Sequence, residues 1–552
     1  MNQLIECVPN FSEGNDLSII KQITDEIEKV EGVRLLNVDP GKATNRTVVT
    51  LVGTPDAVVE AAFNAIKKAG EVIDMSKHKG EHPRMGATDV CPFIPIAGIT
   101  MEETARYAQK LAERVGKELN IPAYLYEHAQ RNPERKNLSV IRAGEYEGFF
   151  KKIKLPEWKP DFGPQEFDAK RGGTVIGARD FLIAYNVNLN TTSVRRANSV
   201  AFDIREAGRK VKNEKGEEVI QPGALKAVKA IGWFIKEYGI AQVSINLTNI
   251  NITPMHIAFD ECVKSAASRG LRVTGSELVG LIPLSAMLDA GKYFLKKQKR
   301  SVGVSEKELI RIAVKSLGLD ELSPFKPEER IIEYLLKDKT KMKLVDMPLS
   351  DFADETASES PAPGGGSISA YIGVLGISLG TMVANLSSHK PGWDERWEEF
   401  SRWAEKGQLI KSELLKLVDE DTDAFNKIMN AFSLAKTSEE DKKTRTKAIQ
   451  EATKYATEIP FKVMQLAYQS MEIIEAMAET GNPNSVSDAG VGALCARSAV
   501  MGAFLNVKIN ASGLADKDFA QGIIQKGEAI EKDAQKAETK ILSIVNSKMQ
   551  TL

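Results

Sequence analysis

The chain has 552 residues, 42% hydrophobic and 27% charged, and its 74 Lys and Arg against 75 Asp and Glu leave a net charge of -1 at pH 7. This length exceeds what one core can organise and predicts about three domains, while the balanced charge provides no field for binding nucleic acid or an anionic membrane. Four widely spaced cysteines exclude a C-x-x-C pair and a disulfide framework. The first six residues contain no basic region or long apolar run, so we expect no signal peptide and a cytoplasmic protein.

Residues 1–180 alternate short strands with amphipathic helices, which predicts an α+β subdomain with helices packed on one sheet. Strands are expected at 4–8, 33–38, 47–52 and 91–96, and helices at 19–30, after Thr54-Pro55 and after a Thr100–Glu103 capping box. A polar turn at 39–46 joins two of the strands. Turn chemistry does not explain Asp39 and Arg46, which stand at strand ends, where binding sites are commonly built.

The loop from His78 to Asp89 contains two of the five histidines of the chain. Histidine titrates nearest neutral pH, so the sequence predicts proton transfer in this loop. The stretch His78–His82 also fits the zinc-binding pattern H-x-x-E-H, which needs both histidines on one helix. Gly80 and Pro83 disfavour that helix, and a solvated loop with incidental histidines is the third alternative.

Residues 181–336 are predicted to form a second α+β subdomain. Strands are expected at 181–189 and 243–248, each with a row of amides and hydroxyls on one face. Such a face suits a polar ligand, and a solvated face is the alternative. A helical stretch is expected around 224–228, between these strands, and a further helix at 256–267.

A charged run within residues 337–345 is the predicted linker to a third domain at 346–552. Beyond it, apolar residues recur with helical periodicity over long stretches. The periodicity predicts an all-α bundle with helices near 394–430, 438–475, 488–508 and 515–548.

A further helix is expected at 367–388, which has no charged residue and contains Gly376 and Gly380 in a G-x-x-x-G pair. The composition fits a membrane span, but its hydroxyl and amide side chains, and the lack of a second segment like it, favour a buried core helix and no membrane span. The glycine-rich turn 361–367 places free N–H groups at the N-terminus of this helix, where an anion can bind. The turn has no Walker lysine, so nucleotide binding is not expected.

Several of these motifs together resemble one known family. Those at 7–14, 45–47 and 82–86 resemble the formiminotransferase domain of the formimidoyltransferase-cyclodeaminase family, and those at 361–367, 419–425 and 487–490 resemble its cyclodeaminase domain. The resemblance covers nearly the whole chain in the domain order of the family. It implies two α+β subdomains of the ferredoxin-like sandwich type, at 1–180 and 181–336, followed by an all-α helical-bundle domain at 346–552.

The resemblance implies a bifunctional folate enzyme of histidine degradation. One activity would transfer the formimino group from N-formimino-L-glutamate to tetrahydrofolate or its polyglutamates. The other would cyclise the product to 5,10-methenyltetrahydrofolate and release ammonia. Tetrahydrofolate is thus expected as a co-substrate without any metal, and the resemblance also implies a homo-oligomer of dimers that assembles up to an octamer.

Matched by position, the resemblance implies that His82 is the catalytic histidine of the transferase. It also implies a folate-binding segment made of Gly163, Pro164, Gln165, Glu166, Phe167, Asp168, Ala169, Lys170, Arg171 and Gly172. Arg84 lies two residues after His82 and is predicted to pair with a carboxylate of substrate or folate in a bidentate fork. Asp39, at its strand end, is a further candidate for binding.

The cyclodeaminase acid is expected to be Asp421, with Asp419 and Asp423 as open alternatives. At about 100° per residue, Asp421 shares the apolar helix face of Leu417 and Val418. An acid on an inward face is costly unless it is paired or used, which favours Asp421 over its neighbours. The alternative for the whole chain is a binding or scaffold protein that has these folds without turnover.

Overall fold

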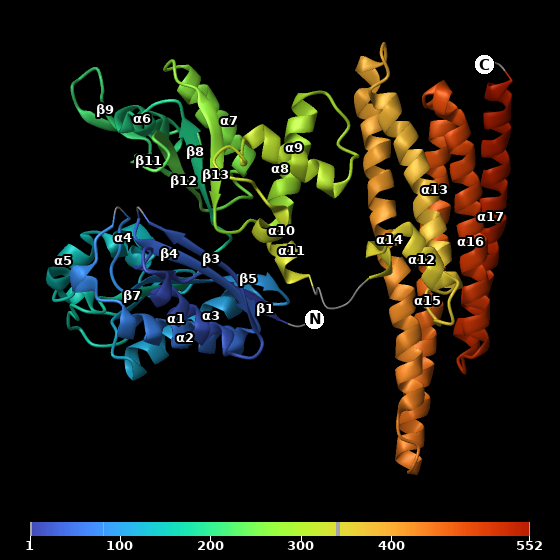
Figure 1. Ribbon diagram of the computed structural model, residues 1–552, viewed down its shortest axis with the longest axis horizontal. Helices are drawn as coiled ribbons and strands as arrows, with labels where there is room; N and C mark the ends of the chain where they lie inside the picture. The colour runs from blue at the N-terminus through green and yellow to red at the C-terminus, as the bar shows by residue number, and fades with distance from the viewer. Residues whose placement is uncertain (1–2, 43, 81, 338–342, 551–552) are drawn as a thin grey trace. The chain divides into compact units, whose positions relative to one another are not determined.

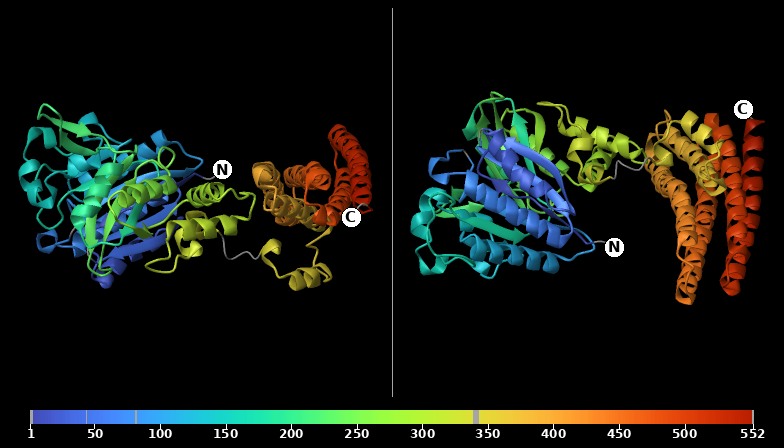
Figure 2. Two further views of the ribbon diagram at one scale, coloured as in Figure 1. Left: turned by 90° about the horizontal axis from the view of Figure 1, so that it is seen from above. Right: turned by 60° about the horizontal axis from the view of Figure 1, so that its bottom comes forward.

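The computed structural model describes residues 3–42, 44–80, 82–337 and 343–550 (Figures 1 and 2). It divides into two compact units: residues 1–290 with 313–337, and residues 291–312 with 338–552. The predicted linker at 337–345 includes residues 338–342, which lie outside the described part, so the linker stays a prediction.

The first subdomain is one sheet with helices packed against it. Its strands are β1 (Leu4–Cys7), β2 (Asn10–Phe11), β3 (Val33–Gly41), β4 (Arg46–Gly53), β5 (Thr88–Ala97), β6 (Ala123–Glu127) and β7 (Thr174–Ala178). Its helices are α1 (Leu17–Glu28), α2 (Pro55–Val72), α3 (Met101–Glu118), α4 (Leu138–Arg142) and α5 (Glu145–Lys152). Within the described residues the strands pair in the order β1-β4-β2-β5-β7-β6, with β3 beside β4, and α1–α3 cover one face (Figure 1).

Local sequence sets where these helices begin. The predicted capping box of α3 is formed: the Glu103 backbone N–H donates to Thr100 Oγ1 at 3.2 Å, and the Thr100 N–H donates to Glu103 Oε2 at 2.9 Å. Apolar side chains such as Ile23 on α1 and Val58 on α2 are then fully buried against the sheet. Each such burial stabilises the fold by about 1.5–3 kcal/mol, so the amphipathic periodicity holds the layer together.

The second subdomain is an antiparallel sheet with two covering helices. Its strands are β8 (Ile183–Leu189), β11 (Val228–Ile235), β12 (Ile240–Leu247) and β13 (Val273–Val279), with a separate hairpin of β9 (Arg209–Lys212) and β10 (Glu218–Gln221). The sheet order is β11-β12-β8-β13, packed against α6 (Val194–Ile204) and α7 (Met255–Ala267). Helices α8 (Leu284–Lys297), α9 (Glu306–Leu317), α10 (Pro327–Arg330) and α11 (Ile332–Leu336) follow.

The prediction of a helical stretch at 224–228 is wrong. Ala227 has a positive φ of 52°, which a continuous right-handed helix does not allow. From Val228 onward the chain pairs with β12 along the whole of β11. Strand pairing therefore overrides the helical preference of this stretch, and the helix between β8 and β12 is α6 instead.

The second unit contains the predicted helical bundle. Its helices are α12 (Leu349–Thr356), α13 (Gly365–Ser388), α14 (Trp397–Ser433), α15 (Glu439–Thr480), α16 (Val486–Ser512) and α17 (Lys517–Met549). The long helices α13–α17 lie side by side around a core of small and branched apolar side chains (Figure 1). The predicted fold class, two α+β subdomains followed by an all-α domain, is confirmed.

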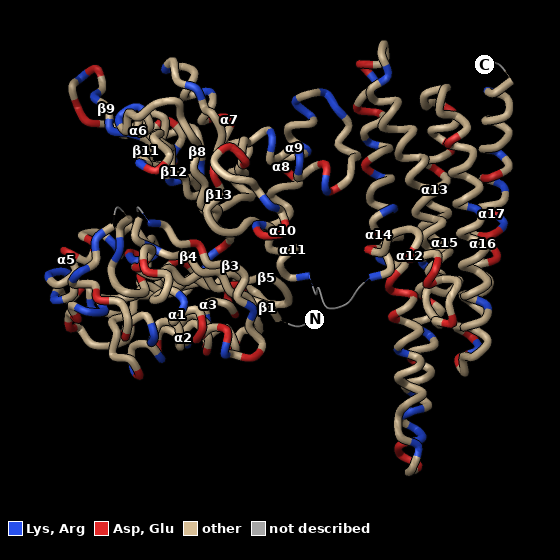
Figure 3. The backbone as a smooth tube through the Cα atoms, viewed as in Figure 1, with Lys and Arg blue, Asp and Glu red and all other residues tan. Residues whose placement is uncertain are grey.

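Among the residues that the structure describes, two helices of the bundle are long and apolar enough to cross a membrane by composition alone: α13 and the segment Pro483–Ser512. The expectation that residues 367–388 have no counterpart is therefore wrong. More than half of each apolar stretch is buried inside the bundle, and Figure 3 shows α13 without any charged residue. Gly376 lets α13 approach α16 so closely that a Cβ there would lie 3.0 Å from the Ala496 backbone nitrogen, as expected for a core helix packed through its glycines.

Candidate active sites

The histidine loop is tied to the turn between β3 and β4. His78 Nε2 lies 2.8 Å from the Asn45 carbonyl oxygen, and its Nδ1 accepts from Arg84 Nε at 3.2 Å. His78–Gly80 are outside any helix, as Gly80 predicts. Within the described ranges, which omit Glu81, no group of three or more His, Cys, Asp or Glu side chains is placed to hold a metal ion.

His82 is half-buried, and one of its ring nitrogens is hydrogen-bonded to the backbone. Its Nδ1 lies 2.7 Å from the Pro83 carbonyl oxygen, so an Nδ1–H tautomer donates there and leaves the lone pair on Nε2. Burial, together with the positive charges of Arg46 and Arg142, lowers the pKa of His82 to about 3. The imidazole is therefore neutral at neutral pH and able to accept a proton.

A buried carboxylate organises the surroundings of His82. Asp89, at the start of β5, is fully buried and accepts from Arg46 Nη1 in a short bond. It also accepts from Arg142 Nη2 at 2.6 Å and Nε at 3.2 Å, and from the Met85 N–H at 2.9 Å. Burial alone would raise the pKa of Asp89, but Arg142 and Arg46 outweigh it, so the carboxylate stays ionised. One carboxylate between two guanidinium groups leaves an excess positive charge beside His82.

The predicted ligand partner Arg84 already has a carboxylate partner in the structure. Its Nη2 and Nη1 donate to the two carboxylate oxygens of Glu147 at 2.6 and 2.8 Å, and Glu145 lies 3.4 Å away. Arg84 is only 5% exposed. A ligand carboxylate at this fork would have to displace Glu147, so the predicted role of Arg84 would require an opened pair.

Asp39, the other predicted binding residue, connects the two subdomains. Its Oδ2 accepts from the Gly280 N–H at 2.9 Å, and Arg330 Nη1 lies 3.8 Å away. This contact gives the carboxylate a structural role at the junction, and its predicted role in binding stays a prediction.

The predicted folate-binding segment, 163–172, packs directly against the histidine loop. The Ala87 N–H donates to the Arg171 carbonyl oxygen at 2.9 Å, and Gly172 (φ 66°) lies so close that a Cβ would overlap the Met85 carbonyl. The φ and the close approach both require glycine at this position. The structure thus joins the C-terminal end of this segment to residues 85–87 of the histidine loop.

The charged side chains of the segment have partners at helix ends. Lys170 Nζ donates to the Glu71 carbonyl oxygen at the end of α2, and Arg171 Nη1 donates to the Leu119 carbonyl oxygen after α3, both at 2.7 Å. Basic groups at helix C-termini are stabilised by the helix dipole. Lys170 and Arg171 therefore hold the segment in place, and whether they also contact folate stays a prediction.

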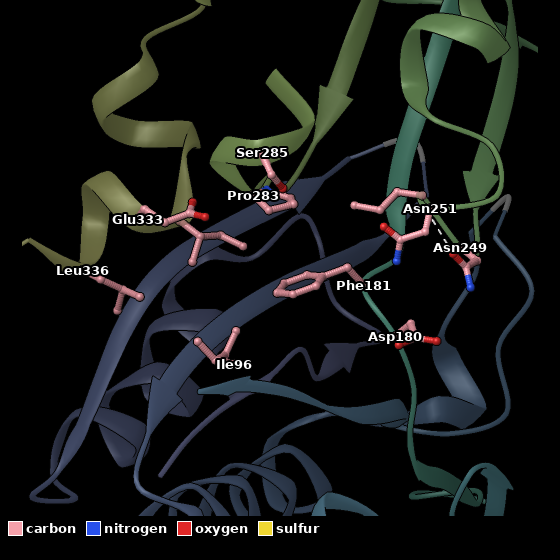
Figure 4. A pocket seen from close by; sticks show the side chains of 11 residues that line it. Ile96, Asp180, Phe181, Asn249, Asn251, Pro283, Ser285, Glu333 and Leu336 are labelled. Carbon is pink, nitrogen blue, oxygen red and sulfur yellow. Dashed lines mark hydrogen bonds between the residues drawn. The ribbon is translucent and has the colours of Figure 1, made fainter. Parts of the chain in front are cut away.

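A cavity of about 260 Å³ opens elsewhere in the first unit (Figure 4). Its lining combines apolar, amide and acidic side chains: Ile96, Asp180, Phe181, Asn249, Ile250, Asn251, Pro283, Ser285, Ile332, Glu333 and Leu336. Ile96 and Asp89 lie near opposite ends of β5. At 3.3 Å per residue they are separated by roughly 23 Å, so the cavity is distinct from the site around His82.

In the second unit, Asp421 on α14 faces the N-terminus of α13. Ser367 Oγ lies 3.2 Å from Asp421 Oδ2, and the Ser367 backbone N–H also donates to this carboxylate. Burial raises the pKa of Asp421, and the two hydrogen bonds from Ser367 only partly oppose it. The carboxyl group is therefore available as an acid at higher pH than an exposed aspartate.

The two neighbouring aspartates are placed differently. Asp423 is exposed. Asp419 accepts from the Leu344 N–H at 2.7 Å and so anchors the segment that enters the bundle. Phe425, four residues after Asp421, is 36% exposed, whereas Ala424 and Ala431 on α14 are buried.

The glycine-rich turn leads into α13, whose first two residues, Gly365 and Gly366, leave little or no room for a side chain. A Cβ on Gly366 would overlap the Asp421 carboxylate, and one on Gly365 would lie 3.2 Å from Asn506 Nδ2. The turn thus forms a polar corner between α14 and α16, with helix N–H groups that favour a negative charge. Asn506 was not predicted, because a single amide within a long apolar helix carries no pattern.

Three family descriptions match the chain in order. "Formiminotransferase domain, N-terminal subdomain" matches residues 4–179, "Formiminotransferase domain" matches 184–337, and "Formiminotransferase-cyclodeaminase" matches 348–529.

Individual relatives match the whole chain or its parts. The chain is 44% identical to the formimidoyltransferase-cyclodeaminase of Mus musculus over 94% of its length and 95% of the mouse protein. It is 44% identical to a glutamate formimidoyltransferase of Thermoplasma acidophilum over 53% of this chain and 92% of that protein. It is also 35% identical to a methenyltetrahydrofolate cyclohydrolase of Methylorubrum extorquens over 36% of this chain and 97% of that protein.

Proposed function

The chain belongs to the formimidoyltransferase-cyclodeaminase family, and on that premise we propose how its own residues carry out the two reactions. It is a bifunctional enzyme: it transfers the formimino group from N-formimino-L-glutamate to tetrahydrofolate, and it cyclises the product to 5,10-methenyltetrahydrofolate with release of ammonia. The finer assignment of residues is the proposal.

The transferase step is assigned to His82. N5 of tetrahydrofolate attacks the formimino carbon, and the tetrahedral adduct must lose a proton from N5 and gain one on the departing glutamate nitrogen. A neutral imidazole can take the first proton and deliver it to the leaving nitrogen, so one histidine serves both transfers. The observation that supports this is the half-buried, neutral His82 with Nδ1 bound to Pro83 and Nε2 carrying the lone pair.

The cyclodeaminase step is assigned to Asp421. N10 attacks the formimino carbon on N5 and its proton passes to the terminal nitrogen. The bond from the carbon to that nitrogen then breaks, and the nitrogen leaves as ammonia after gaining a second proton from an acid. A carboxylic acid whose pKa is raised by burial can supply that proton. Both steps balance with proton transfers between the substrates and these two side chains.

The folate and the subunit arrangement complete the proposal. Tetrahydrofolate, or its polyglutamates, is the co-substrate, held in the first unit by the segment 163–172. The protein acts in the cytoplasm as a homo-oligomer of dimers, up to an octamer. Four free cysteine thiols suit a reducing compartment, and exposed apolar side chains on α13 and α16, such as Leu386 (46%) and Leu505 (66%), suit a subunit interface.

A coupled assay tests the proposed function. The purified protein is incubated with formiminoglutamate and tetrahydrofolate, while glutamate, ammonia and the absorbance of methenyltetrahydrofolate are followed. We expect all three products to appear. A protein that only binds these compounds would release none of them, and activity that is lost on dialysis against a chelator and restored by zinc would favour the H-x-x-E-H alternative.

Gly366→Ala is expected to lower the cyclodeaminase rate by roughly 100-fold, because a Cβ at this position would push the Asp421 carboxylate aside and a 1 Å displacement of a catalytic group can cost that much. The rate is measured on supplied 5-formiminotetrahydrofolate.

Gly364→Ala is the matched control for Gly366→Ala. A Cβ on Gly364 would meet only the Pro361 carbonyl oxygen at 3.8 Å, an ordinary contact. This variant should keep the native cyclodeaminase rate. Equal rates in the two variants would contradict the position given to Asp421.

A further inference from the structure

Arg142 is fixed beside His82 by two separate sets of contacts. Its Nε and Nη2 are bound to Asp89, so Nη1 is the guanidinium nitrogen outside this bridge. The short helix α4 ends at Arg142, and Lys152 Nζ donates to the carbonyl oxygens of Val140, Ile141 and Ala143 at 2.8–2.9 Å around that end. A guanidinium held this firmly loses little entropy when it binds an anion.

A second cation, from the other subdomain, reaches the opposite end of the short helix α4. Lys229 Nζ on β11 donates at 2.9 Å to Oδ1 of Asn137, the residue that caps the N-terminus of α4. Burial of the amine lowers the pKa of Lys229, and the positive charge of Arg142 counteracts the opposing effect of Glu127. A cation whose charged form is disfavoured by burial and by a neighbouring cation is the arrangement expected where an anionic ligand binds.

The charge balance around His82 supports an anion there. The charged groups that act on His82 are Arg46 on β4, Arg142 on α4 and Asp89 on β5. Only Asp89 is negative, so the excess charge is positive. The other nearby guanidinium, Arg84, is already matched by Glu147 and Glu145. Arg142 keeps Nη1 outside its bridge with Asp89, and Lys229 adds a second positive charge that acts on Arg142.

We propose that Arg142 and Lys229 bind the α-carboxylate of the formimino donor and so place its leaving nitrogen at His82. This proposal rests on the transferase activity described above. In formiminoglutamate the α-carboxylate is two bonds from the nitrogen that His82 protonates, so a cation beside His82 is within its reach. The carboxylates of tetrahydrofolate lie beyond its aminobenzoyl ring, far from the reacting N5.

Donor binding at these cations would also change the proton affinity of His82. When the donor carboxylate neutralises the excess positive charge, the pKa of His82 rises in the complex relative to the free enzyme. A base works best when its pKa approaches the operating pH. Binding of the correct donor would thus raise the pKa of the histidine that transfers the protons.

Donor binding without turnover tests the proposal. We would titrate formiminoglutamate alone into the full-length protein by calorimetry. Arg142→Gln and Lys229→Gln are each expected to weaken binding roughly 10- to 100-fold, as loss of a charge-assisted hydrogen bond does, and Arg142→Lys should recover part of it. Lys226→Gln is the control, because Lys226 is 71% exposed and lies 3.7 Å from Glu206.

A donor analogue and the pH profile distinguish binding of the α-carboxylate by Arg142 and Lys229 from a purely structural role of these two residues. The analogue 4-(formimidoylamino)butanoate lacks the α-carboxylate, so it should bind the wild type weakly and lose nothing further in Lys229→Gln. The pH profile of kcat reports the pKa of His82 in the complex, and that of kcat/KM reports it in the free enzyme. In the wild type the acid limb of kcat should therefore lie at higher pH than the acid limb of kcat/KM. In Arg142→Gln the two acid limbs should lie at nearly the same pH.

Two results would overturn the proposal. One is a native affinity for formiminoglutamate in Lys229→Gln. This result would be decisive even if Arg142→Gln did not fold. The other is a raised KM for tetrahydrofolate with donor binding unchanged, which would assign the cations to the folate tail. If the donor binds as expected but no formimino group is transferred, the proposed function fails and the binding assignment stands.

Discussion

His82→Ala is expected to lower the transferase rate by roughly 100-fold or more, because general acid–base catalysis by one side chain contributes 10²–10⁴-fold. The neutral His82 imidazole lies near the side chains of Asp89, Arg46 and Arg142. The lone pair on its Nε2 can accept the proton from N5. Glutamate release from formiminoglutamate and tetrahydrofolate measures the rate. The cyclodeaminase rate on supplied 5-formiminotetrahydrofolate should be unchanged.

Two other histidines serve as controls for this variant. His128→Ala changes an exposed side chain and should leave both rates unaltered. His78→Ala breaks contacts with Asn45 and Arg84, so it should cost less than His82→Ala. Near-native transfer in His82→Ala would remove this residue from the mechanism, and equal losses in His78→Ala and His82→Ala with stoichiometric zinc would favour a metal site.

Asp421→Asn is expected to reduce the cyclodeaminase rate by roughly 100-fold or more, since it keeps the shape of the side chain and removes the proton donor. Formiminoglutamate would still be consumed, so 5-formiminotetrahydrofolate should accumulate. Because burial raises the pKa of Asp421, the wild-type rate should fall as pH rises through that pKa and the acid is lost. This basic limb should be absent from Asp421→Asn.

The neighbouring aspartates provide matched controls for Asp421→Asn. Asp423→Asn changes an exposed residue and should have no effect. Asp419→Asn removes the acceptor of the Leu344 N–H and should lower the thermal stability more than the rate. Methenyltetrahydrofolate formation at the native rate in Asp421→Asn, together with its loss in either control, would move the assignment to that neighbour.

The helical unit could be predicted from the sequence in some detail. Apolar residues recur with a period near 3.6 over more than 30 positions in α14 and α15, and such long signals tolerate local exceptions. The same periodicity placed Asp421 on the inward face, where the structure has it next to Ser367. It could not show that α16, with three charged residues, is apolar enough to cross a membrane by composition.

The transferase site was predictable only in part, because its parts come from distant segments. His82 and Arg46 stand in polar loops that the sequence marks as unusual. Arg142 follows Asp89 by 53 residues, and no local pattern joins a carboxylate to a guanidinium so far away. Lys229 comes from the other subdomain, on a strand that the sequence does not predict. Arg84 was predicted from its closeness to His82, but proximity in sequence could not show that Glu147 already holds it.

We infer that the two reactions occur at two separate sites, one in each unit of the chain. This separation is tested most directly by mixing His82→Ala with Asp421→Asn and following methenyltetrahydrofolate and ammonia from formiminoglutamate and tetrahydrofolate. Neither variant alone should form methenyltetrahydrofolate at more than about 1% of the native rate, whereas the mixture should form it readily as 5-formiminotetrahydrofolate passes from one variant to the other. An inactive mixture, or the loss of both activities in either single variant, would contradict two separate sites.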